Sequence, residues 1–265
     1  MTTRITLDLP SGPIAALTAG APDAPAVLLL PGFTGSKEDF ALILDPIAEA
    51  GLHPVAIDLP GQYESPGRGD FTVEALGADV REVAASLAPL PHLVGHSFGG
   101  FVARAAVIAE PSRFASLTLM DSGPSGIDGG RRARIDQLRP VLVEQGMAAV
   151  YAAMTALAAA EPGYVPPPPA TEAFVRRRFL ASDPAGLLAM GHGVIDEPDR
   201  VDDLAATGLP MLVLTGTDDD AFPPSVQADM AKRLGAEYVE VPGAAHSPAV
   251  ENPPASAAAL IRFWT

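Results

Sequence analysis

The stretch "HLVGHSFGGFVARAAVIAE" (residues 92–110) places a single serine between glycines, at the junction of two different patterns. The apolar run before it predicts a strand that ends near residue 96, and the periodic segment after it predicts a helix over 99–110. Loops that follow the carboxyl ends of strands carry the functional groups of open α/β sheets. Ser97 is therefore expected at the functional edge of a sheet, in a sharp and strained turn.

Short apolar runs and helical periodicity alternate over most of the chain. The predicted strands are 26–30, 53–58, 91–96, 115–121, 210–216 and 236–243, and the further predicted helices are 37–50, 72–87, 225–234 and 254–264. Continuous apolar strands between helices are typical of a parallel sheet that is covered on both faces. The sequence thus predicts an α/β fold with a doubly wound, mostly parallel sheet, and a hairpin of 4–9 and 13–18 at one edge.

Residues 122–208 interrupt this alternation. They contain no predicted strand, and the run "VPPPP" at 165–169 is incompatible with a helix interior or a central strand. We expect helices on both sides of this connector, forming a helical cap, or lid, over one edge of the sheet. The core then consists of 1–121 and 209–265. The arginines at 176–178 are expected on a solvated cap face, with binding of an anionic substrate tail as the alternative.

The composition narrows the class of protein. Lys and Arg number 17 against 32 Asp and Glu, and the formal net charge of −15 disfavours nucleic acids and anionic membranes as partners. Without cysteine, the chain has no disulfide, thiolate metal site or cysteine nucleophile. Neither the first residues nor the apolar stretch 148–160 predicts a signal peptide or a membrane span. The sequence favours a cytoplasmic protein, not inserted in a membrane, that acts on a small molecule.

The pattern Gly-x-Ser-x-Gly at 95–99 has the spacing of a nucleophile elbow; the alternative is a glycine-rich turn with an incidental serine. A serine nucleophile needs a general base. His246, in "VPGAAHSPAVENP", follows the last predicted strand and has small neighbours, so it is the candidate base. His96 adjoins Ser97, but its side chain is expected to point away. Of the remaining histidines, His53 and His92 are expected to be structural. His192 is expected to line a pocket.

An acidic residue is needed to orient the histidine. "LTGTDDDAFPP" (214–224) places Asp218, Asp219 and Asp220 just after the penultimate predicted core strand, and Asp121 ends another strand. The alternative interpretation of Asp218, Asp219 and Asp220 is an acidic turn before a helix. The residues alone leave this choice open.

These pieces resemble the α/β-hydrolase superfamily, and within it the serine-nucleophile, esterase- and lipase-like branch with a helical cap. The resemblance covers essentially the whole chain, and the matching segments are "LLLPGFTGS" (28–36), "AIDLPGQYES" (56–65), "LVGHSFGG" (93–100), "LVLTGTDDDAFPP" (212–224) and "GAAHSPAVENP" (243–253). The chain order Ser…Asp…His is the order used by this fold. Two departures are Pro31-Gly32 in place of His-Gly, and Tyr63 where relatives often have glycine. Tyr63 is expected to repack a loop, with narrowing of the pocket as the alternative.

The resemblance implies a set of site residues. Asp219 lies three residues after the strand-ending glycine and is the implied acid; Asp218 is the second choice, and Asp121 occupies the position that some members use. The backbone N–H groups of Phe33 and Phe98 are the implied oxyanion hole. A substrate pocket is expected under the cap. The alternative is that its candidate residues pack in the core between sheet and helices. The candidates are Phe33, Phe98, Met120, Met190, Phe222 and Pro248.

The implied activity is hydrolysis of a carboxylic ester of a small or medium hydrophobic substrate, through an acyl-enzyme on Ser97. Neither a metal nor an organic cofactor is implied. Thioesterase, lactonase, amidase, C–C bond hydrolase and cofactor-free haloperoxidase activities use the same residues and are the alternatives. A further alternative is a non-catalytic receptor or scaffold with this fold.

Overall fold

The computed structural model describes residues 1–87, 90–161 and 163–265, and within them eight strands form one sheet in the order β1-β2-β4-β3-β5-β6-β7-β8. The strands are β1 (Thr3–Leu9), β2 (Gly12–Thr18), β3 (Ala26–Leu30), β4 (His53–Ile57), β5 (His92–His96), β6 (Ser116–Met120), β7 (Met211–Gly216) and β8 (Glu237–Val241). The strands from β4 to β8 are parallel, and the β1–β2 hairpin joins β4 in antiparallel orientation. The predicted strands, edge hairpin and mostly parallel sheet are confirmed.

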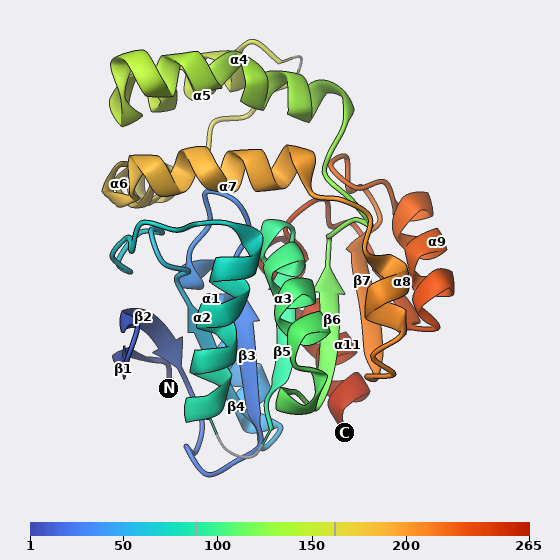
Figure 1. Cartoon of the computed structure of the whole chain (residues 1–265). Helices are drawn as coiled ribbons and strands as arrows, with labels where there is room; N and C mark the ends of the chain where they lie inside the picture. Colours follow the sequence, from blue (N-terminus) through green and yellow to red (C-terminus); the bar gives the residue numbers. More distant parts are fainter. Residues whose placement is uncertain (88–89, 162) are drawn as a thin grey trace.

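Helices cover both faces of this sheet (Figure 1). One face carries α2 (Val73–Ser86), α3 (Phe98–Ala109) and α9 (Pro224–Leu234); the other carries α1 (Ala41–Glu49), α10 (Pro248–Glu251) and α11 (Pro253–Trp264). In β3, Leu28 and Leu30 pack in the core under α2, α3 and α9, and Val27 and Leu29 pack in the core on the opposite face of the sheet. Side chains alternate between the faces of a strand, so an all-apolar strand contributes to both cores.

The predicted helix boundaries agree with the structure to within a few residues. Thr72 caps α2, since its hydroxyl accepts a hydrogen bond of 3.3 Å from the Ala75 N–H. The helix expected over 37–50 is divided into a 3₁₀ turn (Lys37–Phe40) followed by α1. Within the described part of the chain, none of the helices combines the length and the apolarity that crossing a membrane would require.

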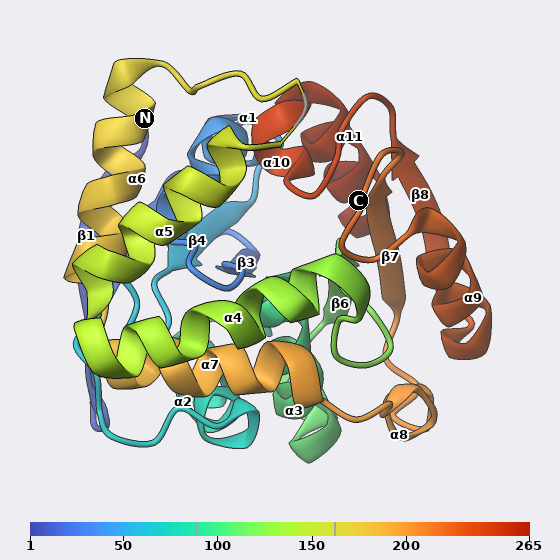
Figure 2. The ribbon, with the colours of Figure 1, turned by 90° about the horizontal axis from the view of Figure 1, so that it is seen from above.

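The insertion between β6 and β7 is helical. It contains α4 (Gly129–Gln145), α5 (Met147–Ala159), α6 (Pro169–Ala181), α7 (Pro184–Asp196) and α8 (Val201–Ala205). Helices α4 to α7 lie over the carboxyl ends of the strands, and Figure 2 shows α4, α5 and α6 from above, across β3, β4 and β6. Helix α8 instead packs beside the sheet against α9. The last part of the predicted cap segment therefore lies at the side of the sheet.

A buried arginine joins both ends of the α4–α7 part of this insertion to α3. The Arg104 side chain, in a residue only 1% exposed, donates hydrogen bonds to the Pro124 carbonyl (2.6 Å) and to the Glu197 carboxylate (3.0 Å). It also donates to the Pro198 carbonyl at 3.2 Å. Residue 124 lies between β6 and α4, and residues 197–198 lie between α7 and α8, so one side chain holds both ends of the α4–α7 part of the insertion against the core.

Replacing Arg104 by methionine should lower the free energy of unfolding by about 3–5 kcal/mol, because Glu197 would stay buried without its cation. Urea denaturation measures this change. The double variant Arg104→Met/Glu197→Leu should recover most of the loss, since it removes the unpaired charge as well. A single variant as stable as the wild type would contradict a structural role for this pair.

Candidate active site

Ser97 lies in the turn between β5 and α3. Its backbone has φ 51° and ψ −117°, a conformation that non-glycine residues rarely adopt. A Cβ on Gly95 would overlap the Gly99 carbonyl oxygen, and a Cβ on Gly99 would lie 2.5 Å from the Pro31 carbonyl oxygen. Both glycines are therefore required where β5, α3 and the loop after β3 meet, which is the strained turn that the sequence predicts.

Neighbouring strands hold this turn in place. The Ser97 N–H donates to the Met120 carbonyl at 2.9 Å, and the Ser97 carbonyl accepts from the Ser122 hydroxyl, also at 2.9 Å. Both partners belong to the end of β6 and the residues that follow it. The sequence analysis did not single out Ser122, because nothing in its local pattern shows that it would reach the turn after β5.

Three side chains from distant loops form a hydrogen-bonded chain. His246 Nε2 lies 3.0 Å from Ser97 Oγ, and His246 Nδ1 lies 2.9 Å from Asp219 Oδ1. The three loops follow β5, β7 and β8, which are parallel, so their carboxyl ends meet at the same edge of the sheet. The structure thus brings together the serine, histidine and aspartate that the sequence analysis selected.

Asp219 is held by several donors. Its Oδ1 accepts from the Ala221 N–H (2.8 Å) and the Phe222 N–H (3.3 Å), and its Oδ2 accepts from Gln227 Nε2 (2.9 Å). Gln227, on α9, is fully buried and is a functional candidate that the sequence analysis missed. Asp218 is exposed, so of the two neighbouring carboxylates only Asp219 is fixed toward the histidine.

Asp121, the alternative acid, has a different environment. Its side chain is fully buried, and its Oδ1 accepts a hydrogen bond from the Gly216 N–H at 2.8 Å. Burial, reinforced by the negative charge of Asp219, raises the pKa of Asp121 to about 8. At neutral pH this carboxyl group is protonated, and it forms no hydrogen bond with His246 in the described structure.

His96 differs from its predicted orientation. Its Nε2 lies 2.7 Å from the His246 carbonyl oxygen, and the two imidazole centroids are 5.3 Å apart, so the ring points toward the site. Burial, with repulsion from His246, lowers the pKa of His96 to about 4, so the ring is neutral and Nε2–H donates to that carbonyl. His53 and His92 are structural: the first binds the Ala19 carbonyl and the second stacks on Trp264. His192 is not a cavity residue.

The two expected oxyanion donors are free to bind a ligand. Neither the Phe33 nor the Phe98 N–H donates a hydrogen bond within residues 1–87, 90–161 and 163–265. Gln62 Nε2 donates to the Gly32 carbonyl at 2.9 Å. Because the C=O and N–H of a trans peptide point in opposite directions, this bond also sets the direction of the Phe33 N–H. Gln62 is 3% exposed and was not identified from the sequence.

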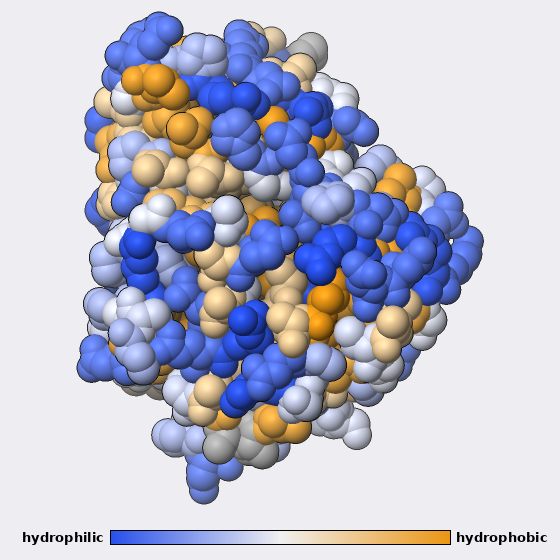
Figure 3. All heavy atoms as spheres, viewed as in Figure 1, coloured by the Kyte–Doolittle hydropathy of each residue, from blue (hydrophilic) through white to orange (hydrophobic). Residues whose placement is uncertain are grey.

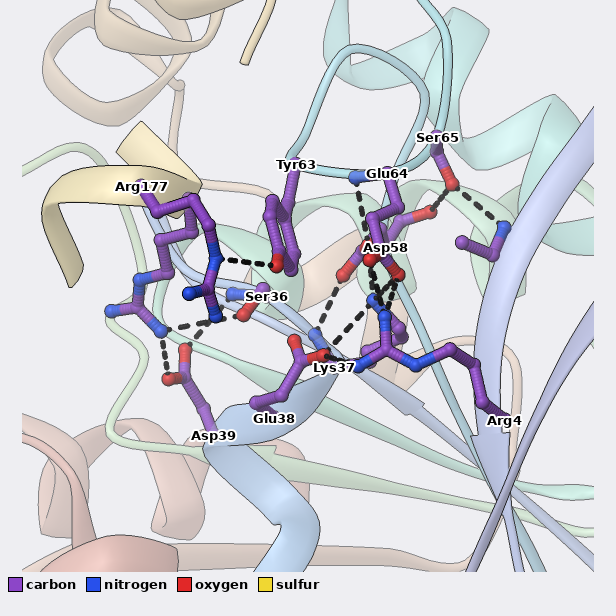
Figure 4. A network of polar contacts seen from close by, with 12 residues as sticks. Arg4, Ser36, Lys37, Glu38, Asp39, Asp58, Tyr63, Glu64, Ser65 and Arg177 are labelled. Atoms are coloured by element: carbon purple, nitrogen blue, oxygen red, sulfur yellow. Dashed lines mark hydrogen bonds and ion pairs between the residues drawn. The ribbon is translucent and has the colours of Figure 1, made fainter. Parts of the chain in front are cut away.

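A buried ionic network supports the same loop (Figure 4). Lys37 Nζ lies 2.8 Å from Asp58 Oδ2 and 2.7 Å from Glu64 Oε2, and the Lys37 N–H donates to Asp58 Oδ1 at 2.8 Å. Tyr63 packs over this lysine, whose Nζ is 4.7 Å from the ring centroid, and its hydroxyl accepts from Arg177 Nε at 3.3 Å. Tyr63 is not a cavity residue, in line with the expected repacking of a loop.

A cavity of about 780 Å³ opens between Ser97 and the insertion. In Figure 3, apolar residues are visible between the uppermost helices and the sheet. The apolar side chains that line the cavity include Phe33, Ile135, Leu138, Leu142, Val150, Met154, Phe179 and Leu187.

Only Phe33 of the expected pocket residues lines this cavity. Met190 and Phe222 pack in the core under α2 and α3, and Met120 packs in the core on the opposite face, each at most 4% exposed. Phe98 and Pro248 are buried as well. The expectation for these five residues is corrected: their side chains are buried, mostly in the cores, whereas most of the cavity lining comes from other residues of the insertion.

The described residues contain one group of side chains that could be considered for a metal ion: His96, Asp121 and His246, with ligand atoms within 4.8 Å of one another. Both His246 nitrogens are engaged by Ser97 and Asp219. A protonated Asp121 and a His96 bound to a carbonyl are poor ligands. The chemistry of this donor set does not fit a metal.

The sheet order, the strained serine turn and the three-residue chain together define a class, the α/β hydrolases. Residues 27–259 match the model of the alpha/beta hydrolase family, and the chain belongs to this family. Among solved structures, a carboxylesterase of the thaumarchaeon Nitrososphaera gargenis has a TM-score of 0.81 at 20% identity, covering 98% of this chain and 97% of that chain. The enol-lactonase of Burkholderia xenovorans LB400 has a TM-score of 0.78 at 21% identity, covering 98% and 99%.

The similarity to curated relatives is local. A protein of Variovorax paradoxus (strain S110), provisionally named carbamate hydrolase RutD, is 36% identical over 106 residues, which are 39% of this chain and 40% of the relative. The 2-hydroxy-6-oxononadienedioate/2-hydroxy-6-oxononatrienedioate hydrolase of Klebsiella pneumoniae is 32% identical over 103 residues, covering 37% and 34%. The chain thus spans about two fifths or less of the length of these relatives.

The buried Asp121 predicts a pH dependence of stability. Its folded-state pKa of about 8 exceeds the value of about 3.9 for an unfolded Asp, so folding favours the protonated form. The contribution of Asp121 to the free energy of unfolding is therefore largest below about pH 4. This contribution is lost as the pH rises toward about 8. Asp121→Asn removes this loss and keeps an acceptor for the Gly216 N–H. The difference in Tm between the variant and the wild type should therefore grow across this window; a constant difference would contradict the assignment.

Proposed function

We propose that the protein is a serine hydrolase that cleaves a carboxylic ester of a small or medium hydrophobic substrate. The observation that carries this proposal is the hydrogen-bonded chain Ser97–His246–Asp219, beside which the amides of Phe33 and Phe98 have no acceptor among the described residues. A serine with an adjacent base, an oriented imidazole and two backbone donors is the combination that acyl transfer requires.

In this mechanism Ser97 Oγ attacks the ester carbonyl while His246 Nε2 takes its proton. Asp219 holds the Nδ1–H tautomer and stabilises the imidazolium that forms. The amides of Phe33 and Phe98 bind the negatively charged oxygen, and each such donor typically accounts for about 10²–10³ in turnover. His246 then protonates the leaving alcohol, and a water molecule deprotonated by the same histidine releases the acid.

The insertion supplies most of the proposed substrate pocket. Side chains of α4, α5, α6 and α7 line the cavity above Ser97, so we assign residues 122–208, apart from the laterally packed α8, as the cap. The apolar lining supports a hydrophobic acyl chain, because burial of each methylene from water contributes about 0.8 kcal/mol.

Cleavage of a C–C bond is a second candidate. The 32% identity to a 2-hydroxy-6-oxononadienedioate hydrolase favours it, and the same serine, histidine and aspartate would be used. A panel of esters, thioesters, lactones, amides and ketones compares these reactions directly. The ester proposal requires that esters have the highest kcat/KM in this panel.

Ser97→Ala should lower kcat for a short-chain para-nitrophenyl ester by about 10⁶-fold, since the nucleophile is lost. The measurement is release of para-nitrophenol, with circular dichroism to show that the variant is folded. A fluorophosphonate probe should label the wild type at Ser97 and leave the variant unlabelled. Turnover that survives in a folded Ser97→Ala variant would remove this serine from the mechanism.

The acid is tested by three matched substitutions. Asp219→Asn should lower kcat by about 10⁴-fold, because it stabilises the wrong imidazole tautomer. Asp218→Asn should retain turnover close to that of the wild type, since Asp218 is exposed to solvent. Asp121→Asn should also remain active. If Asp121→Asn were the crippling change, Asp219 would not be the acid.

A further inference from the structure

One segment of the insertion, residues 129–181, carries a net positive charge in an otherwise acidic chain. Residues 129–181 contain seven arginines and four carboxylates, whereas the whole chain has a net charge of −15. Figure 3 shows strongly hydrophilic residues over the uppermost helices of the molecule. The roof of the cavity is thus the cationic part of an acidic protein.

Several of these arginines line the cavity itself. On α4 they share a helix face with the apolar lining, at the spacing of three and four residues that places side chains on one side of a helix. The lining arginines are Arg131, Arg134 and Arg139 on α4 and Arg178 on α6. A cap that served only a neutral hydrophobic chain would have no use for guanidinium groups on this face.

The lining arginines differ in whether the carboxylate that each pairs with also lines the cavity. Arg131 pairs with Asp220 and Arg178 pairs with Asp39, and both aspartates also line the cavity. Arg134 and Arg139 pair with Glu161 and Asp136, which do not line it. Those two pairs are largely exposed, and such pairs contribute about 1 kcal/mol or less, so their guanidinium groups can change partner readily. We call Arg134, Arg139 and Arg178 the arginine wall.

Arg178 is the most enclosed member of the arginine wall, with a side chain 15% exposed. Its Nη1 donates to Asp39 and lies 3.4 Å from Ser36 Oγ, whereas Nε is buried without a partner. Nη2 makes no hydrogen bond within the residues that the structure describes. Nε is therefore unsatisfied and Nη2, which is not buried, is available to a ligand; a carboxylate is the group that a guanidinium binds best.

We propose that the arginine wall binds a carboxylate of the substrate, and that the preferred substrates are esters whose acyl chain ends in a carboxylate, such as monoesters of dicarboxylic acids. This inference rests on the proposed esterase function. Ser97 lies at the floor of the cavity and the arginine wall belongs to its roof, so the two ends of the acyl chain bind at separate places. The apolar side chains between them contact the methylene groups.

The kinetic test compares the para-nitrophenyl monoester of adipic acid with para-nitrophenyl hexanoate. These two esters have the same chain length and differ in a terminal carboxylate in place of a methyl group. A charged hydrogen bond contributes about 1.5–3 kcal/mol, so kcat/KM should favour the adipate ester about tenfold or more. Added salt should reduce this ratio, because it screens the charges. A ratio of one or below, in an enzyme that cleaves the hexanoate ester, would overturn the proposal and leave the esterase function intact.

Four variants separate binding of the carboxylate from a structural role of Arg178. Arg178→Gln and Arg139→Gln should each lower the adipate-to-hexanoate ratio. Arg176→Gln, on the same helix but exposed and outside the cavity lining, should retain the wild-type ratio. Asp39→Asn breaks the same ion pair as Arg178→Gln but leaves the cation, so it should raise the ratio. If Asp39→Asn lowered the ratio as Arg178→Gln does, the pair would be structural and the proposal would fail.

A binding measurement makes the test independent of turnover. Calorimetry on Ser97→Ala should show tighter binding of monomethyl adipate than of its neutral counterpart dimethyl adipate, by about tenfold. The double variant Ser97→Ala/Arg178→Gln should lose this difference. Equal binding of both molecules by Ser97→Ala would overturn the arginine wall as a carboxylate site, whatever reaction the protein catalyses.

Discussion

The structure depends on one steric constraint, the close approach of β5, α3 and the loop after β3 around Ser97. This crossing is possible because Gly95 and Gly99 lack side chains where backbone atoms approach. The serine backbone takes up the strain, with φ 51°, and hydrogen bonds to Met120 and Ser122 hold it there. The same geometry starts α3 at Phe98, so the hydroxyl and the amide at the beginning of the helix face the same space.

The candidate acids show how environment distinguishes chemically identical side chains. Asp219 accepts hydrogen bonds from two backbone amides and from Gln227, which fix its carboxylate toward His246. Asp121 is buried with few donors, which raises its pKa to about 8 and keeps it neutral at neutral pH. Asp218 is exposed to solvent. Of the three aspartates, Asp219 is therefore the one whose carboxylate is held against the histidine, 2.9 Å from His246 Nδ1.

The insertion is tied to the core at more than one place. Arg104 holds both ends of its α4–α7 part at α3, while Arg178 and Arg177 on α6 contact Asp39 and Tyr63 in the loops after β3 and β4. The loop that contains Phe33 is thus held from below by Lys37 and Asp58 and from above by Arg178. The roof that carries the arginine wall is attached to the same loop that supplies a candidate oxyanion donor.

The sheet, the order of its helices, Ser97 and His246 could be predicted from patterns in the sequence, whereas Asp219 was singled out from its neighbours only by the resemblance to a family. Apolar runs, glycine spacing and strand-end positions are local patterns, and the shared edge of a parallel sheet brings strand-end residues together. Only the tertiary structure decided that His96 turns toward the site, that Gln62, Gln227 and Ser122 support it, and that arginines of the insertion line the cavity. These contacts join residues far apart in the chain, and local periodicity carries no information about which helix face of an insertion meets a cavity. For the same reason Met120, Met190 and Phe222 looked equally suited to a pocket and to the core.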